Sequence, residues 1–174
     1  MNHSSIDLKA SSLLVVDDNP DSLSLLTEML KRHGFRVRPI PDGKSVLEAV
    51  ISEPPDLILL DISMPEMNGY EVCEQLKAHE HFSEIPVIFI SGLNNPMDKV
   101  KAFSFGGIDY ITKPFNFEEL EARITMQLEL CQQRQLLRER YEQLTQLEKL
   151  RDNLVHMMIH DMRSPLGGIY PLCQ

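Results

Sequence analysis

Three carboxylates, a hydroxyl and an ammonium stand directly after short apolar runs of this sequence. Asp17 and Asp18 follow the run LLVV, and Asp61 follows LILL. Further along the chain, Ser91 follows VIFI and Lys113 follows YIT. In open α/β sheets, sites lie at the edge where the carboxyl ends of the parallel strands meet. If the four runs are such strands, these side chains converge on one site.

Three like charges at one site repel one another, so the set predicts a bound cation. Carboxylate oxygens are hard ligands that favour Mg²⁺, which in proteins combines a few carboxylates with waters and phosphate oxygens. This combination indicates phosphoryl chemistry, in which one carboxylate attacks phosphorus and forms an acyl phosphate. The hydroxyl of Ser91 and the ammonium of Lys113 would then hold the phosphoryl oxygens as charge develops.

Short apolar runs alternate with amphipathic stretches over most of the chain. The runs are Leu13–Val16, Phe35–Val37, Leu57–Leu60, Pro86–Ile90 and Ile108–Ile111. The amphipathic stretches cover residues 20–33, 43–52, 68–79 and 95–105, and a last one begins at residue 116. Two of the runs are unbroken, as in strands that are covered on both faces. Because parallel strands need long crossovers, the alternation predicts an α/β fold with a five-stranded, doubly wound parallel sheet.

From Asn116 onward the sequence predicts one long helix with Asn116 as its cap. No Pro occurs between Phe115 and Ser164, and Glu, Gln, Leu and Arg dominate, all of which favour helices. Apolar residues recur with the spacing of a coiled-coil seam in two sets: Leu137, Tyr141 and Leu144, then Leu147, Leu150, Leu154 and Met157. The step between the sets is a phase slip of the stammer kind. An uncovered apolar stripe predicts a partner, and we expect a homodimer through this helix. A parallel pair is favoured over a single helix that folds back on its own domain, but the charge pattern leaves the parallel or antiparallel sense open.

Composition excludes several classes of protein. The chain has 174 residues and a net charge of −9, which suits one domain with an extension and disfavours nucleic-acid binding. No apolar run approaches the 20 or so residues that a membrane span needs. The three cysteines, Cys73, Cys131 and Cys173, form neither a metal-binding pair nor an even framework. We therefore expect reduced thiols in a cytoplasmic protein.

Four segments closely resemble the receiver domains of response regulators, over about residues 11–131. They are VVDDNP (15–20), LLDISMPEMNGYE (59–71), FISG (89–92) and DYITKPF (109–115), in the order and at the spacing of that family. The resemblance implies a flavodoxin-like fold with strand order 2-1-3-4-5.

The resemblance also implies a role for each polar residue. Asp61 would be the phosphoryl acceptor, and Asp17, Asp18 and Asp61 would hold Mg²⁺ together with the backbone carbonyl of Ser63. Ser91 would be the switch hydroxyl, Tyr110 the switch aromatic, and Lys113 the family's lysine, joined to Pro114 by a cis bond.

Taken one at a time, these residues also suit plainer roles. Asp18 before Asn19–Pro20 has the sequence of a helix cap or a turn. Ser91 beside Gly92 would serve as a turn residue, and Tyr110 as an ordinary strand aromatic. Gly69 fits a close backbone approach better than any chemistry. The complete set, however, favours the phosphoryl site.

A second resemblance lies at residues 160–170, where HDMRSPLGGIY is similar to the H-box of sensor histidine kinases. It implies His160 as a phosphoryl acceptor, with Asp161 helping to deprotonate or orient the ring. Pro165 would bend or open the helix. The alternative is that His160, like His156, is an ordinary surface histidine of a helix.

These features divide the chain into a polar leader (1–11), a receiver (12–131), a coiled-coil linker helix (132–153) and the start of an H-box helix (154–174). We expect the N-terminal piece of a hybrid histidine kinase, since no nucleotide-binding motif is present. The predicted function is two-component phosphorelay signalling: a phosphohistidine donor protein phosphorylates Asp61, and a dimeric helix relays a conformational change to a histidine kinase region. The alternatives are a complete ATP-dependent phosphotransferase and a structural dimerisation module with an inactive receiver.

Overall fold

The structure is a computed structural model that describes residues 10–92 and 96–163. Over these residues the strands are β1 (Ser12–Val16), β2 (Arg36–Ile40), β3 (Leu57–Asp61), β4 (Val87–Ser91) and β5 (Asp109–Thr112). The helices are α1 (Pro20–Arg32), α2 (Lys44–Ser52), α3 (Gly69–Ala78), α4 (Pro96–Ser104) and α5 (Phe117–Arg163). Strands and helices therefore alternate along the whole described chain.

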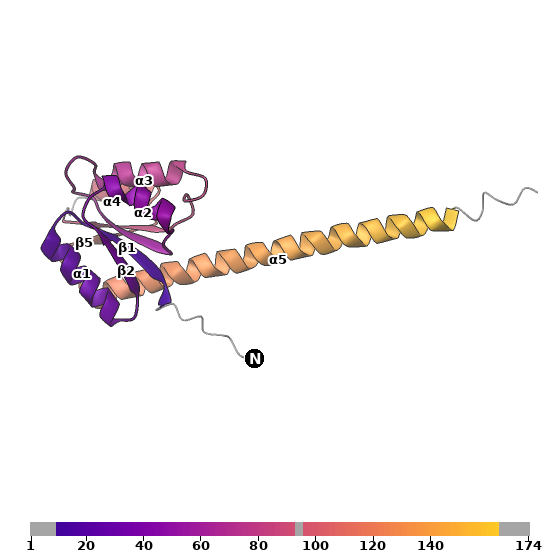
Figure 1. Cartoon of the computed structure of the whole chain (residues 1–174), viewed down its shortest axis with the longest axis horizontal. Coiled ribbons are helices and arrows are strands. Elements are labelled where there is room, and N and C mark those ends of the chain that lie inside the picture. The colour runs from indigo at the N-terminus through magenta and orange to yellow at the C-terminus, as the bar shows by residue number, and fades with distance from the viewer. Residues whose placement is uncertain (1–9, 93–95, 164–174) are drawn as a thin grey trace, which may run out of the picture. The chain divides into compact units, whose positions relative to one another are not determined.

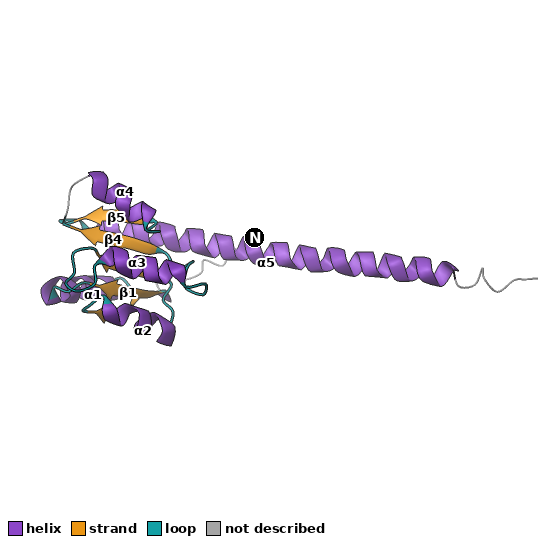
Figure 2. Cartoon of the chain, turned by 90° about the horizontal axis from the view of Figure 1, so that it is seen from above, coloured by secondary structure: helices purple, strands orange, loops and turns teal. Residues whose placement is uncertain are grey.

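All strand pairs are parallel, and the sheet has the order β2-β1-β3-β4-β5 (Figures 1 and 2). Helices α2, α3 and α4 pack on one face through Val50, Val72 and Ala102. Helix α1 and the first turns of α5 pack on the other face through residues such as Leu26 and Ile124. The predicted doubly wound α/β fold with strand order 2-1-3-4-5 is confirmed.

Burial on both faces explains why the sequences of the central strands are apolar without interruption. In β1, Leu14 and Val16 face the helices α2 to α4, whereas Leu13 and Val15 face α1 and α5. Strand β3 divides its side chains in the same way, and no residue of β1 or β3 is more than slightly exposed. Alternation between two buried faces leaves no polar face in the sequence pattern.

Strand β2 is longer and differently placed than the predicted run Phe35–Val37. It begins at Arg36 and continues to Ile40, with Arg36 and Pro39 exposed. Because β2 is an edge strand, one side of it faces solvent, and a proline without an N–H is tolerated there. Because the second half of β2 contains an arginine and a proline, it does not form an apolar run in the sequence.

Side-chain caps start three of the helices close to the site described below. Asn19 caps α1 by accepting hydrogen bonds from the backbone N–H groups of Asp21 and Ser22. Asn68 and Glu71 form a reciprocal capping box at the start of α3. Asn116 accepts from the N–H of Glu119 at 2.6 Å, as predicted for the first turn of α5. These caps satisfy N–H groups that have no partner inside their helices.

The chain divides into two compact units, Met1–Cys131 and Gln132–Gln174, and α5 contributes to both. In the first unit, α5 buries Leu120, Ile124 and Leu128. In the second unit, large apolar side chains of α5 such as Leu137 and Leu150 are more than half exposed.

Every helix in the described ranges is too short or too polar to span a lipid bilayer. Among the described residues, neither Cys73 nor Cys131 forms a disulfide.

Gly69 gives a test of how tightly the loop after β3 is packed. A Cβ atom at this position would lie 2.4 Å from the Asp61 carbonyl oxygen and 2.9 Å from the Ile62 Cα, both backbone atoms. We expect Gly69→Ala to lower the free energy of unfolding by about 1–3 kcal/mol, as overpacking does. Gly92→Ala is the matched control, because nothing lies within 4 Å of its added Cβ. Urea denaturation measures both, and an equal effect of the two substitutions would contradict this packing.

Candidate functional site

The carboxyl ends of four strands bring the predicted residues to one edge of the sheet. Asp17 and Asp18 follow β1, Asp61 ends β3, Ser91 ends β4, and Lys113 follows β5. One carboxylate oxygen from each of Asp17, Asp18 and Asp61 lies within 4.8 Å of the others. Asp17 and Asp61 are buried, whereas Asp18 is exposed. The structure thus forms an acidic cluster from residues 44 positions apart in sequence.

The Lys113 ammonium lies between the two buried carboxylates. Its Nζ donates to Asp17 Oδ2 at 2.8 Å and, at a longer 3.5 Å, to Asp61 Oδ1. Burial opposes the charge on Lys113, but the hydrogen bond to Asp17 and the charge on Asp61 outweigh it, so the pKa of Lys113 is raised. The Lys113–Pro114 peptide bond is cis, as the family resemblance implied.

Asp61 is held in an environment that disfavours its charge. Burial, opposed by the Lys113 ammonium but reinforced by the carboxylate of Asp17, raises its pKa to about 6. At neutral pH the group is still predominantly the carboxylate, because the pH then lies above that pKa. Asp61 is therefore a nucleophilic carboxylate, and any cation that binds beside it stabilises this charged form.

The orientation of Asp17 depends on a contact that the sequence did not predict. The Asn19 backbone N–H donates to Asp17 Oδ1 at 2.9 Å, while Lys113 occupies Oδ2. Asn19, not Asp18, is also the cap of α1. The Asp18 side chain is thereby left for another partner. The signal was the dipeptide Asn19–Pro20, in which a cap precedes Pro at the first helical position.

The donor set of the acidic cluster fits Mg²⁺. Three carboxylates against one ammonium leave an excess of negative charge, and all three side chains offer hard oxygen ligands. Ser63 lies two residues after Asp61, in the loop that follows β3, and it is exposed and not part of the core. Asp17, Asp18 and Asp61, with the Ser63 carbonyl, are the residues that would hold the ion.

Ser91 and Tyr110 lie further inside. Ser91 is fully buried, and its carbonyl accepts from the Lys113 N–H at 2.8 Å, which ties the end of β4 to the residue after β5. Tyr110 is 5% exposed and packs in the core beneath α2, α3 and α4. In this structure the aromatic ring of Tyr110 is therefore turned inward.

His160 and Asp161 belong to the second unit, whereas the residues of the acidic cluster belong to the first. His160 Nδ1 lies 3.7 Å from Asp161 Oδ1, and both side chains are more than three quarters exposed on α5. Arg163 ends the helix. The rest of the H-box segment, including Pro165, lies outside the described residues.

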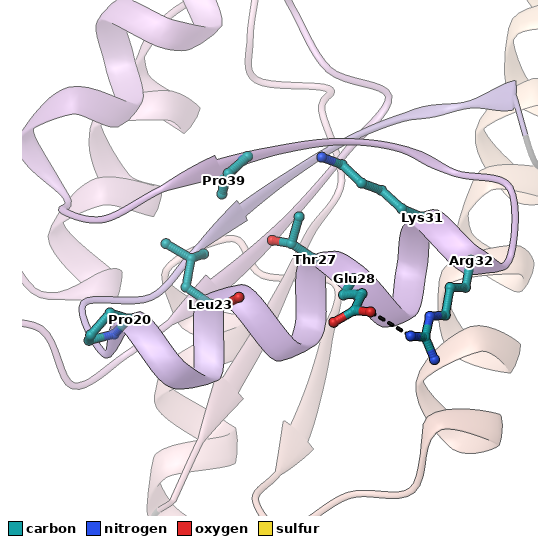
Figure 3. Close-up of a pocket in the computed structure, with 8 residues that line it drawn as sticks. Pro20, Leu23, Thr27, Glu28, Lys31, Arg32 and Pro39 are labelled. Carbon is teal, nitrogen blue, oxygen red and sulfur yellow. Dashed lines mark hydrogen bonds and ion pairs between the residues drawn. The ribbon is translucent and has the colours of Figure 1, made fainter.

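An open groove of about 770 Å³ runs between α1 and β2 (Figure 3). Leu23, Thr27 and Pro39 line it, and Glu28 pairs with Arg32 at its rim. None of the acidic-cluster residues contributes to its lining. The groove is a surface feature distinct from the strand-end site.

A family model described as the response regulator receiver domain matches residues 13–125. A probable cyclic di-GMP phosphodiesterase of Vibrio cholerae is 41% identical over 123 residues, which are 71% of this chain and 28% of that protein. Hybrid signal transduction histidine kinase D of Dictyostelium discoideum is 32% identical over 194 aligned residues, covering 93% of this chain and 12% of that protein. The chain thus spans less than a third of the length of these two relatives.

Solved structures give the same fold. The receiver domain of a signal transduction histidine kinase from Syntrophus aciditrophicus has a TM-score of 0.65 and 32% identity, over 69% of this chain and 91% of that one. NtrX from Brucella abortus has a TM-score of 0.68 and 31% identity, over 74% of this chain and 29% of that one.

Magnesium should stabilise the fold through the acidic cluster. At free Mg²⁺ ten times the dissociation constant, linkage predicts a gain of about 1.4 kcal/mol in the free energy of unfolding. Asp18→Asn should reduce this gain, because Asp18 is an exposed member of the cluster whose loss leaves the core intact. Thermal unfolding with MgCl₂ or EDTA measures the effect, with exposed Asp152→Asn as control. A gain that is equal in both variants would contradict the metal site.

Stability should depend on pH through Asp61. Its folded pKa of about 6 lies above the ordinary value of 3.8 for an aspartate, so protonation favours the fold and this contribution is lost as the pH rises through 6. In EDTA at pH 7, Asp61→Asn should therefore be more stable than the native chain by roughly 1–3 kcal/mol. Between pH 7 and pH 5 the difference should shrink by about 1 kcal/mol. A difference that stays constant over this range would show that Asp61 is not strained by its charge.

Proposed function

The chain belongs to the response regulator receiver domain family of two-component signalling, and from this we propose that residues 12–131 accept a phosphoryl group on Asp61. The observation that carries the proposal is the position of Asp61, buried at the end of β3 within reach of both Lys113 and the carboxylates after β1. We propose a phosphohistidine of another protein as the donor. The reaction would be Mg²⁺-dependent, with Asp17, Asp18, Asp61 and the Ser63 carbonyl as ligands.

The chemistry follows from the charges at the site. An Asp61 carboxylate oxygen attacks phosphorus and forms an acyl phosphate, while the phosphorus–nitrogen bond breaks and its electron pair returns to the donor imidazole. Bound Mg²⁺ would supply positive charge to the phosphoryl oxygens. Lys113 is already 3.5 Å from Asp61 and would exchange part of its contact with carboxylate oxygen for phosphoryl oxygen. Ser91 would provide a hydroxyl from the adjacent strand.

The output of the receiver would travel through α5. We propose that Ser91 and Tyr110 respond to the phosphoryl group and that α5 carries the change from the receiver into a linker helix at 132–153. The helix is continuous from Phe117 to Arg163, which supports mechanical coupling. Its exposed apolar side chains beyond Cys131 support a homodimer through this helix.

The target of this relay would be a histidine kinase region that starts at about residue 154. His160 would be its phosphoryl acceptor, with Asp161 beside the ring. Support comes from the hybrid histidine kinase of Dictyostelium, whose alignment covers 93% of the chain and so extends beyond the receiver. The proximity of Asp161 to the exposed His160 ring is compatible with that role.

Phosphorylation of Asp61 is tested by the intact mass of the chain after incubation with acetyl phosphate and MgCl₂. We expect one added phosphoryl group on the native chain, none on Asp61→Asn, and a large loss when EDTA replaces MgCl₂. The exposed acidic variant Asp152→Asn is the matched control and should be labelled like the native chain. No addition, or an addition that survives in Asp61→Asn, would leave the receiver as an inactive dimerisation module. Labelling by ATP alone would instead support a complete kinase.

A further inference from the structure

The part of α5 in the second unit carries more apolar surface than one simple seam explains. From Leu136 to Met162 its large apolar side chains are 49–74% exposed. A coiled-coil seam takes positions separated alternately by three and four residues. The residues of α5 form two such series, which differ by a single position along the chain.

The first register runs through Leu137, Tyr141 and Leu144 and resumes at Val155, Met158 and Met162. Between these two parts it passes through Glu148 and Arg151. The second register runs through Leu147, Leu150, Leu154 and Met157, and on its N-terminal side it passes through Arg140 and Gln143. One residue of an α-helix corresponds to a rotation of about 100°. The two seams therefore lie on different faces of the same helix.

If α5 pairs with a parallel second copy, the polar residues within each register decide which register the seam can follow. In such a pair each seam residue faces the same residue of its partner. Continuing the first register would place Glu148 against the partner's Glu148, and Arg151 against its counterpart. Extending the second register toward the N-terminus would place Arg140 against the partner's Arg140. Either choice buries like charges at the seam, which is unfavourable.

We propose that α5 pairs with a parallel second copy of this chain and that the seam changes from the first register to the second between Leu144 and Leu147. This inference rests on the homodimer proposed above. It keeps leucine or tyrosine at every seam position from Leu137 to Leu154 and removes Arg140, Glu148 and Arg151 from the seam.

The flanking charges fit the same arrangement. In a parallel pair, the residue before one seam position faces the residue five places later on the partner. In the first register this pairs Arg140 with Thr145 of the other copy, and in the second it pairs Gln146 with Arg151. Each arginine thus meets an uncharged residue. Arg151 also pairs within its own chain with Asp152, at 2.9 Å.

Thr145 lies at the change of register, and its side chain is bonded to the helix backbone there. Its Oγ1 donates to the Tyr141 carbonyl at 2.9 Å, in addition to the backbone hydrogen bonds of the helix. Such back-bonding of Thr slightly destabilises and bends helices. The seam therefore rotates at a point where bending of the helix costs less free energy.

The register has a consequence for His160. In the second register Asp161 is a seam position and His160 flanks it, next to the partner helix. In the first register Met162 is the seam position, and His160 lies on the outermost face. A one-residue change of register at this end therefore moves His160 between the interface and solvent.

Disulfide formation between copies tests the change of register. Single cysteines are placed at Gln143, Leu144, Leu147 or Glu148 in the full chain with Cys131→Ser and Cys173→Ser; Cys73 is kept because it is fully buried. We expect Leu144→Cys and Leu147→Cys to cross-link several-fold faster than Gln143→Cys and Glu148→Cys. Fast cross-linking at 144 and 148, or at 143 and 147, would mean one uninterrupted register and overturn the proposal. Equal rates at all four positions, or none, would overturn the parallel seam itself.

A gain of apolar surface provides the second test. Glu148→Leu with Arg151→Leu makes the first register apolar throughout. In this background we expect the preferred cross-link to move from Leu154→Cys to Val155→Cys, and a preference that stays at 154 would contradict the role of the two charges. Acetyl phosphate labelling of Asp61 in the same samples reports the receiver separately, so a failed seam and an inactive receiver give different results.

Discussion

Repulsion among the carboxylates of Asp17, Asp18 and Asp61 is the constraint that organises the first unit. Three acids within 4.8 Å of one another are tolerated because Lys113 reaches two of them and because Asp18 remains in solvent. Burial nevertheless raises the pKa of Asp61 to about 6, with smaller contributions from Asp17 and Asp18, so Lys113 offsets the cost of the buried charge only in part. A site in this condition gains from every added positive charge, which is a useful property where a metal ion and a phosphoryl group must bind together.

The rest of the fold keeps this unfavourable arrangement in place. The backbone of Lys113 is held in place, because its N–H is bonded to the Ser91 carbonyl and the preceding strand β5 is paired with β4. Asp61 ends a strand with no exposed residue, and the Asp61 carbonyl stands close to Gly69, where a side chain would clash. Asp17 is fixed by the Asn19 N–H, which belongs to the cap of α1. A close-packed sheet covered on both faces leaves the two buried carboxylates, Asp17 and Asp61, little room to move apart.

The sheet and the position of the acidic cluster could be predicted from the sequence. Buried parallel strands have unbroken apolar sequences, and the carboxyl ends of such strands lie at the same edge of the sheet. The runs LILL and VIFI became β3 and β4 within a residue or two of the prediction. Strand β2 was less visible, because an edge strand needs fewer apolar residues and Arg38 and Pro39 interrupt the pattern. The hold of Asn19 on Asp17 and the inward position of the Tyr110 ring were not predictable, because both depend on tertiary packing and not on spacing.

The two units meet the problem of like charges in opposite ways. At the sheet edge the acids are gathered and a lysine is inserted among them, so that binding of cations relieves the strain. Along α5, seam positions of a parallel pair would bring Glu148 or Arg140 against its own copy, where no opposite charge is available. A helix can remove a charged residue from a seam only by rotating, and one residue of rotation is about 100°. In the proposed parallel pair, the charged residues of α5 thus decide which face of the helix forms the seam.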